Sequence, residues 1–199
     1  MPEKKEIFAG LQSHIIYNKD LEGESGKLRS TQEFFLLSYG VYDWLSLDLK
    51  GGLGNIQKHS SVSEDIDYPT YLAGGYGFRV RLYQANNKKA VFGFQHISVH
   101  PKTVSVEGSK NKVVLDDWQF SLLGSYDFKK ITPYLGVRWS RVGYIHWKDK
   151  DRQLVKSDLT KDVGLILGFD LPVTEKIWVN LEGGLVDGEA ASLSINYRF

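Results

Sequence analysis

The chain ends in Ala191-Ser192-Leu193-Ser194-Ile195-Asn196-Tyr197-Arg198-Phe199, in which apolar and polar residues alternate without interruption. Successive side chains of an extended chain point to opposite faces, so this segment predicts a β-strand with one apolar and one polar face. The same alternation recurs along the chain, for example at Leu45, Leu47 and Leu49, which are separated by polar residues. No window has a 3.6-residue apolar stripe, and we therefore expect an all-β protein with almost no helix.

The alternating segments predict about ten strands, bounded by turns and polar stretches. Their expected ranges are 6–17, 31–42, 44–57, 68–83, 89–99, 112–126, 131–146, 158–170, 175–185 and 190–199. Connections after odd-numbered strands are mostly long and polar (18–30, 58–67, 100–111 and 147–157), whereas those after even-numbered strands are short. The connection at 186–189 is the exception, because it follows an odd-numbered strand and is short.

A glycine-rich sheet of this size exposes backbone at its edges unless it closes on itself. We therefore predict a single domain over residues 1–199, a closed up-and-down antiparallel β-barrel of about ten strands, with eight strands as the alternative. An even number of strands places both termini at the end with the short turns. The different loop lengths indicate that the two ends of the barrel meet different environments.

Composition excludes several classes of function. The 25 Lys and Arg residues against 24 Asp and Glu give a net charge of +1, which offers no reason to expect a nucleic-acid partner. The absence of cysteine excludes disulfides, thiolate metal sites and cysteine nucleophiles. The five histidines have no metal-binding spacing, and no predicted helix follows the glycine-rich 51–54 to hold a phosphate. We expect no metal and no other cofactor.

Hydropathy does not separate a soluble barrel from a membrane barrel. The mean hydropathy is −0.29, and no stretch reaches the roughly 18 to 20 apolar residues of a membrane-spanning helix. A transmembrane barrel escapes this test because its strands alternate lipid-facing and interior-facing residues. The first six residues, Met1-Pro2-Glu3-Lys4-Lys5-Glu6, lack the apolar core of a signal peptide. If the protein is exported, we expect this sequence to be the mature chain with an added Met.

Two interpretations fit the alternation: a soluble barrel that carries an apolar ligand inside, or a membrane barrel with its apolar face in lipid. Glycines and charges on the polar face, together with long loops at one end only, favour the membrane barrel. Aromatic residues, which favour membrane interfaces, gather at the ends of the predicted strands. They are Tyr17, Tyr42, Trp44, Tyr126, Phe128, Tyr134, Tyr144, Trp147, Trp178, Tyr197 and Phe199.

In a membrane barrel the polar face lines the lumen, and its charged residues then need partners. The candidates for such a network are Asp48, Lys50, Arg79, Arg81, Asp117, Arg138, Asp170, Glu182 and Arg198. A ten-stranded barrel is only modestly wider than an eight-stranded one, which side chains fill. We expect a closed or very narrow lumen, with a selective pore as the alternative. Strand parity also points His14 into the lumen.

The ending Leu193-Ser194-Ile195-Asn196-Tyr197-Arg198-Phe199 resembles the carboxy-terminal strand of bacterial outer-membrane β-barrel proteins. Segments 39–45 and 132–137 are similar to turns and strand beginnings of small opacity-type barrels. The resemblance implies that Tyr197 and Phe199 are recognised by the barrel-assembly machinery, and that the protein is a monomer in the bacterial outer membrane. It implies contacts with outer-membrane lipids and with lipopolysaccharide, and a structural, surface-interaction or narrow-channel role.

One constellation has catalytic chemistry. Strand parity puts Phe94, His96 and Ser98 on the lipid-facing side, near the long-loop end of their strand. If the 100–111 connection folds symmetrically, Asp116 comes opposite Ser98 on the next strand, and Trp118 comes opposite His96. A serine, a histidine and an acid within reach of one another are the groups needed for nucleophilic acyl transfer.

This arrangement resembles the outer-membrane lipid A 3-O-deacylases, which are small barrels with an outward-facing Ser–His–acid site. The resemblance implies His96, Ser98 and Asp116 as catalytic residues of a lipid A acyl-ester hydrolase. The chain departs from that family in having Val99 after the serine where Asn is usual, Asp in place of Glu, and two more strands than eight. We expect a non-enzymatic role, in which His96 and Ser98 mark the edge of the apolar band and His100 begins the loop. The hydrolase is the alternative.

Overall fold

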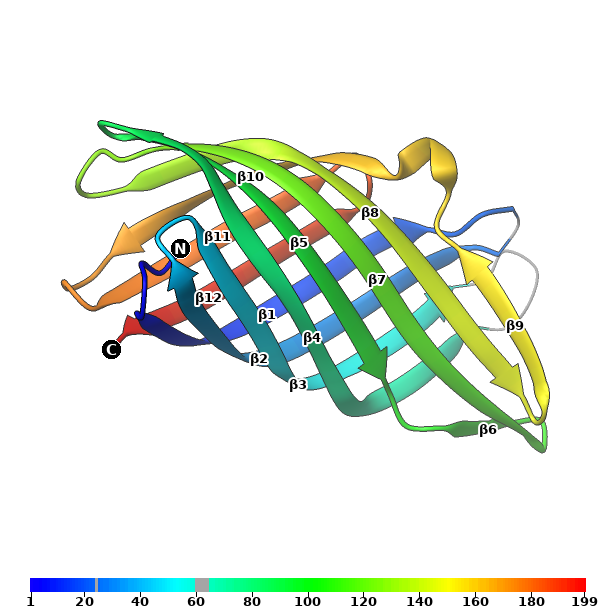
Figure 1. Cartoon of the computed structure of the whole chain (residues 1–199). Coiled ribbons are helices and arrows are strands. Elements are labelled where there is room, and N and C mark those ends of the chain that lie inside the picture. Colours follow the sequence, from blue (N-terminus) through cyan, green and yellow to red (C-terminus); the bar gives the residue numbers. More distant parts are fainter. Residues whose placement is uncertain (24, 60–64) are drawn as a thin grey trace.

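A computed structural model describes residues 1–23, 25–59 and 65–199 (Figure 1). The described part contains twelve strands and one short 3₁₀ helix. The strands are β1 (Ile7–Asp20), β2 (Lys27–Tyr42), β3 (Leu45–His59), β4 (Ile66–Ala85), β5 (Lys88–His100), β6 (Val104–Val106), β7 (Ser109–Tyr126), β8 (Thr132–Lys148), β9 (Asp151–Lys156), β10 (Val163–Pro172), β11 (Ile177–Leu185) and β12 (Glu189–Arg198). No helix among these residues is long and apolar enough to cross a membrane.

Ten of the strands form a closed antiparallel barrel with up-and-down connectivity. Each strand pairs with its neighbour in sequence along the wall, and β12 pairs with β1 to close the cylinder. The remaining two, β6 and β9, extend the wall as short edge strands on β7 and β8. Both chain ends lie at the end with the short turns (Figure 1). The predicted barrel is confirmed, and the eight-strand alternative is wrong.

Two long connections and one strand differ from the prediction. Residues 100–111 and 147–157 were predicted as connections between strands, but they contain β6 and β9. The strand expected at 158–170 starts only at Val163, because Leu159–Lys161 form a 3₁₀ helix, and the Asp158 carboxylate caps it by accepting from the Thr160 N–H. Residue 24 of the predicted 18–30 connection, and residues 60–64 of the 58–67 connection, lie outside the described residues.

Large apolar side chains cover the outside of the barrel wall. They include Leu11, Phe35, Leu37, Leu47, Leu49, Leu53, Tyr76, Phe120, Leu122, Leu135, Val137, Leu165, Leu167, Leu181, Leu193 and Ile195, each at least 38% exposed. A continuous apolar surface of this extent is unfavourable in water and favourable in hydrocarbon. The interpretation of the chain as a soluble carrier with its apolar face inside is therefore wrong.

Aromatic side chains lie around the outside of the barrel at its short-turn end. Tyr42 stacks on Trp44 with ring centres 5.5 Å apart, Tyr126 lies 4.5 Å from Phe128, and Tyr197 lies 4.9 Å from Phe199. Such rings are suited to the boundary between lipid and water. Three of the predicted interface aromatics instead face the interior: Tyr134 donates to Glu182, Tyr144 belongs to a buried cluster, and Trp178 packs edge-on against buried Phe8.

The polarity of the two faces reverses along the strands. On β7, the outward positions change from Lys112 and Asp116 to Trp118, while the inward positions change from Leu115 to Asp117. The long-loop part of the lumen is accordingly filled by an apolar core, formed by Leu21, Leu28, Phe34, Ile56, Tyr68, Ala73, Ile97, Val99, Val113, Leu115, Val142 and Tyr144. A barrel segment that stands in water must bury apolar groups inside, as a soluble protein does.

This reversal corrects the expected lumen. The charged and polar network occupies the short-turn and middle parts of the lumen and gives way to the apolar core toward the long loops. The longest strands span both parts, since β4 has 20 residues and β7 has 18, whereas crossing a bilayer takes roughly 9 to 11.

Candidate active site on the outer face and the polar lumen

The candidate catalytic residues lie on β5 and β7, where both strands leave the apolar band. Ser98 is paired with Asp116, and His96 is paired with Trp118, so the predicted register is confirmed. Ile97 and Val99 point into the apolar core, which directs His96, Ser98 and His100 outward by the alternation of the strand. The side chains of the predicted site therefore face away from the lumen.

Ser98 lies at the centre of this cluster. Its hydroxyl donates to Asp116 Oδ1 at 2.5 Å, and its Oγ lies 2.9 Å from His100 Nε2. His96 Nε2 lies 3.6 Å from Asp116 Oδ1, which is an ion-pair distance for a protonated imidazole and too long for a hydrogen bond. The serine thus contacts a carboxylate and an imidazole at once, and the imidazole is that of His100.

His96 is held between two aromatic rings. Its ring centre lies 4.4 Å from that of Trp118 and 5.3 Å from that of Tyr76. Its side chain is 15% exposed, whereas that of Asp116 is 31% exposed. His96 therefore belongs to the aromatic band, and Asp116 lies one step closer to water.

Glycines on β3 and β4 leave the cluster open on one side, whereas on the β8 side a Cβ added at Gly143 would lie 3.5 Å from the Leu154 side chain. Gly74 is paired with Ser98 and with Gly51, and Gly143 is paired with Asp116. A Cβ added at Gly51 would meet no atom within 4 Å, so no neighbouring side chain covers this surface. Ser98 is accessible from the outside of the barrel along this row.

The lumen residues predicted from parity form separate pairs in the short-turn and middle parts of the barrel. Arg79 donates to both carboxylate oxygens of Asp48, at 2.8 and 2.5 Å, and Lys50 donates to Gln12 at 3.0 Å. Asn180 joins Asp170 to the Tyr134 hydroxyl, which donates to Glu182 at 2.9 Å.

Two of the predicted lumen cations lie near the short-turn end. Arg198 lies over the Phe8 ring at 5.2 Å. At Arg81 the strand is irregular, and its backbone N–H donates to the Trp44 carbonyl oxygen.

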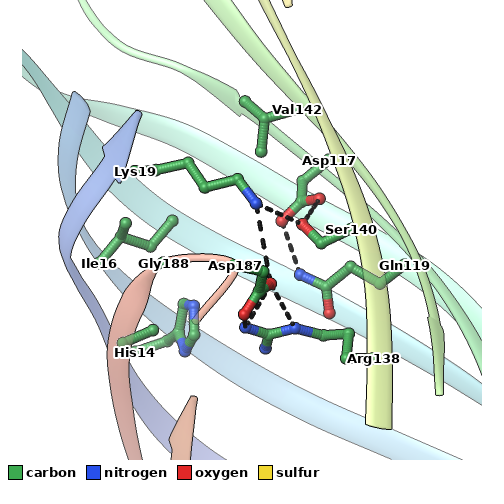
Figure 2. A pocket seen from close by; sticks show the side chains of 11 residues that line it. His14, Ile16, Lys19, Asp117, Gln119, Arg138, Ser140, Val142, Asp187 and Gly188 are labelled. Atoms are coloured by element: carbon green, nitrogen blue, oxygen red, sulfur yellow. Dashed lines mark hydrogen bonds and ion pairs between the residues drawn. The ribbon is translucent and has the colours of Figure 1, made fainter. Parts of the chain in front are cut away.

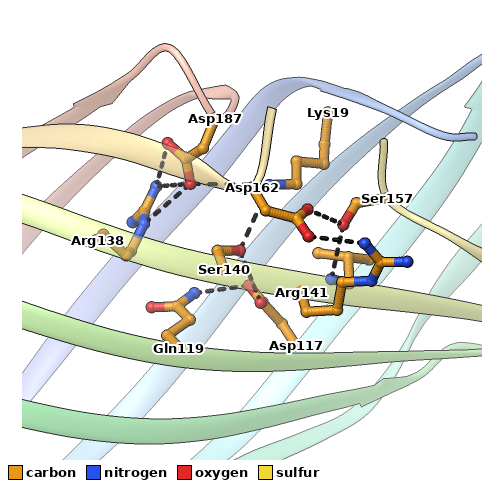
Figure 3. Close-up of polar contacts among 10 residues, drawn as sticks. Lys19, Asp117, Gln119, Arg138, Ser140, Arg141, Ser157, Asp162 and Asp187 are labelled. Carbon is orange, nitrogen blue, oxygen red and sulfur yellow. Dashed lines mark hydrogen bonds and ion pairs between the residues drawn. The ribbon is translucent and has the colours of Figure 1, made fainter. Parts of the chain in front are cut away.

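The middle of the lumen contains a buried cluster of charged residues, two of which were not predicted from the sequence. Asp187 accepts from Arg138 through both oxygens at 3.0 to 3.2 Å and forms an ion pair with Lys19 Nζ at 3.7 Å (Figure 3). Asp117 accepts from Ser140 at 2.9 Å beside them. Lys19 and Asp187 were missed because both fall in segments predicted to be connections.

Glycines on the inner face of the wall leave the space that the Asp187 carboxylate and Arg138 occupy, and they are the sequence feature that could have indicated this cluster. A Cβ added at Gly164 would overlap the Asp187 carboxylate, and one at Gly184 would lie 2.7 Å from an Arg138 nitrogen. The connection between β11 and β12 folds into the lumen, and Val186 adopts a left-handed φ of 80°, which is a strained conformation for a β-branched residue. The short length of this connection and the glycines facing it distinguish it from the other connections at the long-loop end.

A small cavity of ≈20 Å³ in the middle of the lumen is lined by His14 and the Lys19–Arg138–Asp187 cluster among others (Figure 2). That volume holds about one water molecule. His14 faces the lumen, as predicted. His59 ends β3, and its Nδ1 lies 2.7 Å from Asp65 Oδ2. Within the described ranges, no three His, Asp or Glu side chains are grouped in a way that could hold a metal ion.

No protein-family model matches the chain. Among solved structures, the translocator domain of the autotransporter NalP from Neisseria meningitidis matches with a TM-score of 0.53 and 12% identity, covering 100% of this chain and 90% of that one. An outer-membrane channel from Pseudomonas putida F1 matches with a TM-score of 0.50 and 12% identity, covering 100% and 97%. The fold is that of an outer-membrane β-barrel.

Within this outer-membrane β-barrel fold, the cluster on β5 and β7 has the groups required for acyl transfer. A hydroxyl is a weak nucleophile until a neighbouring base removes its proton, and imidazole is the base best matched to neutral pH. Asp116 supplies a negative charge beside the hydroxyl and the two imidazoles. The sequence analysis missed the contact between Ser98 and His100, because it assigned His100 to the loop.

Proposed function

We propose that the protein resides in the bacterial outer membrane and hydrolyses acyl esters of outer-leaflet lipids, with Ser98 as the nucleophile. One observation carries this proposal: on the outward face, Ser98 Oγ lies within hydrogen-bond distance of both a histidine nitrogen and a carboxylate. A polar cluster that served only to end the apolar band would not need its serine between a base and an acid.

The depth of the cluster supports a lipid substrate. Trp118 and Tyr76 lie on its apolar side, and Lys112 lies beyond Asp116 on its polar side. Ester bonds of membrane lipids lie at this boundary, between the acyl chains and the polar headgroups. Lipid A of lipopolysaccharide carries ester-linked acyl chains and is the substrate that we propose.

The closed lumen argues against the narrow-channel role. The ion cluster around Asp187 fills the middle of the barrel, and the apolar core fills the part nearer the long loops. A scaffold or surface-interaction role needs neither an outward-facing serine nor a base beside it, and it is the conclusion to be drawn if no ester is cleaved.

The test is mass spectrometry of lipid A from cells that express wild-type protein or Ser98→Ala. We expect wild type to release ester-linked acyl chains and Ser98→Ala to leave lipid A as in cells without the protein. Ser13→Ala is the matched control: Ser13 also donates to a carboxylate, Glu33, at 2.8 Å on an exposed part of the wall. Identical lipid A from wild-type and Ser98→Ala cells would exclude the hydrolase.

A further inference from the structure

We infer that His100, and not His96, is the general base that activates Ser98. This inference rests on the proposed function, and it changes the residue assignment that the lipid A deacylase resemblance implies. Its basis is the geometry of the two imidazoles: His100 Nε2 lies 2.9 Å from Ser98 Oγ, whereas the polar contact of His96 is with Asp116, at 3.6 Å.

The strand geometry explains why His100 can reach the serine. His100 and Ser98 are two residues apart on one face of β5, so the longer imidazole can bend back over the hydroxyl. Pro101 follows and restricts His100 to an extended backbone conformation. Pro101 is buried, and the N–H of Lys102 donates to the Pro69 carbonyl at 2.9 Å, which fixes the end of β5.

The surroundings of the two histidines assign them different tasks. His96 is packed between Trp118 and Tyr76, where its ring has little freedom to rotate. There it acts as a positioning residue that keeps Asp116 next to Ser98. His100 is exposed on the polar side of the serine, where an imidazole can exchange a proton with water.

His100 can carry the proton in both halves of the reaction. Ser98 Oγ bonds to the ester carbonyl carbon as its proton moves to His100 Nε2. The ester C–O bond then breaks, and the departing sugar oxygen takes that proton. In the second half, His100 removes a proton from water, the resulting hydroxide bonds to the acyl carbon, and Ser98 leaves and recovers the proton. The Asp116 carboxylate lies on the other side of the Ser98 hydroxyl, and its negative charge stabilises the imidazolium that forms on His100 in each half of the reaction.

The experiment compares His100→Ala and His96→Ala, refolded in detergent micelles with purified lipid A, with and without added imidazole. Released fatty acid is measured by mass spectrometry. We expect His100→Ala to slow hydrolysis by roughly 10²- to 10⁴-fold. Added imidazole should restore a part of that loss, because the His100 position is exposed. His96→Ala should lose less activity and gain nothing from imidazole.

Heat-modifiable migration on a gel serves to verify that each variant is folded. The inference is overturned if His96→Ala is the variant that loses activity and is rescued by imidazole. It is also overturned if folded His100→Ala keeps wild-type activity, in which case Asp116→Asn would identify the carboxylate as the base. Neither result affects the proposed function, which fails separately if Ser98→Ala is as active as wild type.

Discussion

Asp187 is the shared partner of two buried cations, Lys19 and Arg138. Replacing it by alanine leaves both charges buried beside a cavity of only ≈20 Å³, and breaking a buried ion pair in this way costs about 3–5 kcal/mol. We expect Asp187→Ala to lower the free energy of unfolding by that amount, as measured by urea denaturation of the barrel in lipid vesicles. Asp151→Ala, at an exposed edge strand, should change it by less than about 0.5 kcal/mol.

At the residue scale, what could be predicted depended on whether a side chain lay in a regular strand. The pairing of Ser98 with Asp116 followed from strand parity and a symmetric connection, and it is confirmed. The contact between Ser98 and His100 was not predictable in that way, because it depends on the rotamers of two residues on one strand. The position of Asp187 could not be predicted from strand parity, because the residue lies in a connection that folds inward and brings it to Arg138.

β12 joins the two ends of the wall, and it is the element on which closure depends. It pairs along its length with both β1 and β11, and the Phe199 N–H donates to the Ile7 carbonyl at 3.1 Å. We propose that its terminal aromatic residues are also read by the assembly machinery. Deleting Phe199 should reduce the heat-modifiable, membrane-inserted form in cells, as measured on semi-native gels. Refolding of the purified chain into micelles should be nearly unaffected.

If the deletion impairs refolding in micelles as strongly as insertion in cells, Phe199 acts on stability and not on recognition.

Among the elements, the ten wall strands were predictable because each has a period-two pattern that spans many residues. The short strands β6 and β9 were not, since three and six residues of polar sequence at the edge of a sheet carry little pattern of their own. Pairing with the ends of β7 and β8 is what makes them extended.

For the whole molecule, the filled lumen predicts that the barrel does not conduct. Purified protein inserted in planar lipid bilayers should give no stable ionic current, with a wide-pore porin run in parallel to show that insertion is detected. The reason is that two layers obstruct the path, the Lys19–Arg138–Asp187 cluster and the apolar core beyond it. Reproducible current steps from wild-type protein would contradict the closed lumen.

The closed architecture followed from the sequence because sheet edges have to be satisfied and the alternation recurs in each of the ten wall strands. The partition of the lumen into a polar and an apolar part did not. Strand parity points Leu115 and Val99 inward, toward a lumen that was expected to be polar. That apolar residues belong there becomes clear only from their depth along the barrel, and depth is a property of the assembled barrel.

The reversal of polarity along the strands also determines how high the molecule stands in the bilayer. Two residues of strand correspond to roughly 7 Å. If the barrel moved outward by that distance, the ring of Trp118 would be exposed to water. If it moved inward, Lys112 and Asp116 would enter the hydrocarbon core. Both movements are unfavourable. The protein therefore has one preferred depth in the bilayer, which sets the height of its water-facing rim above the lipid.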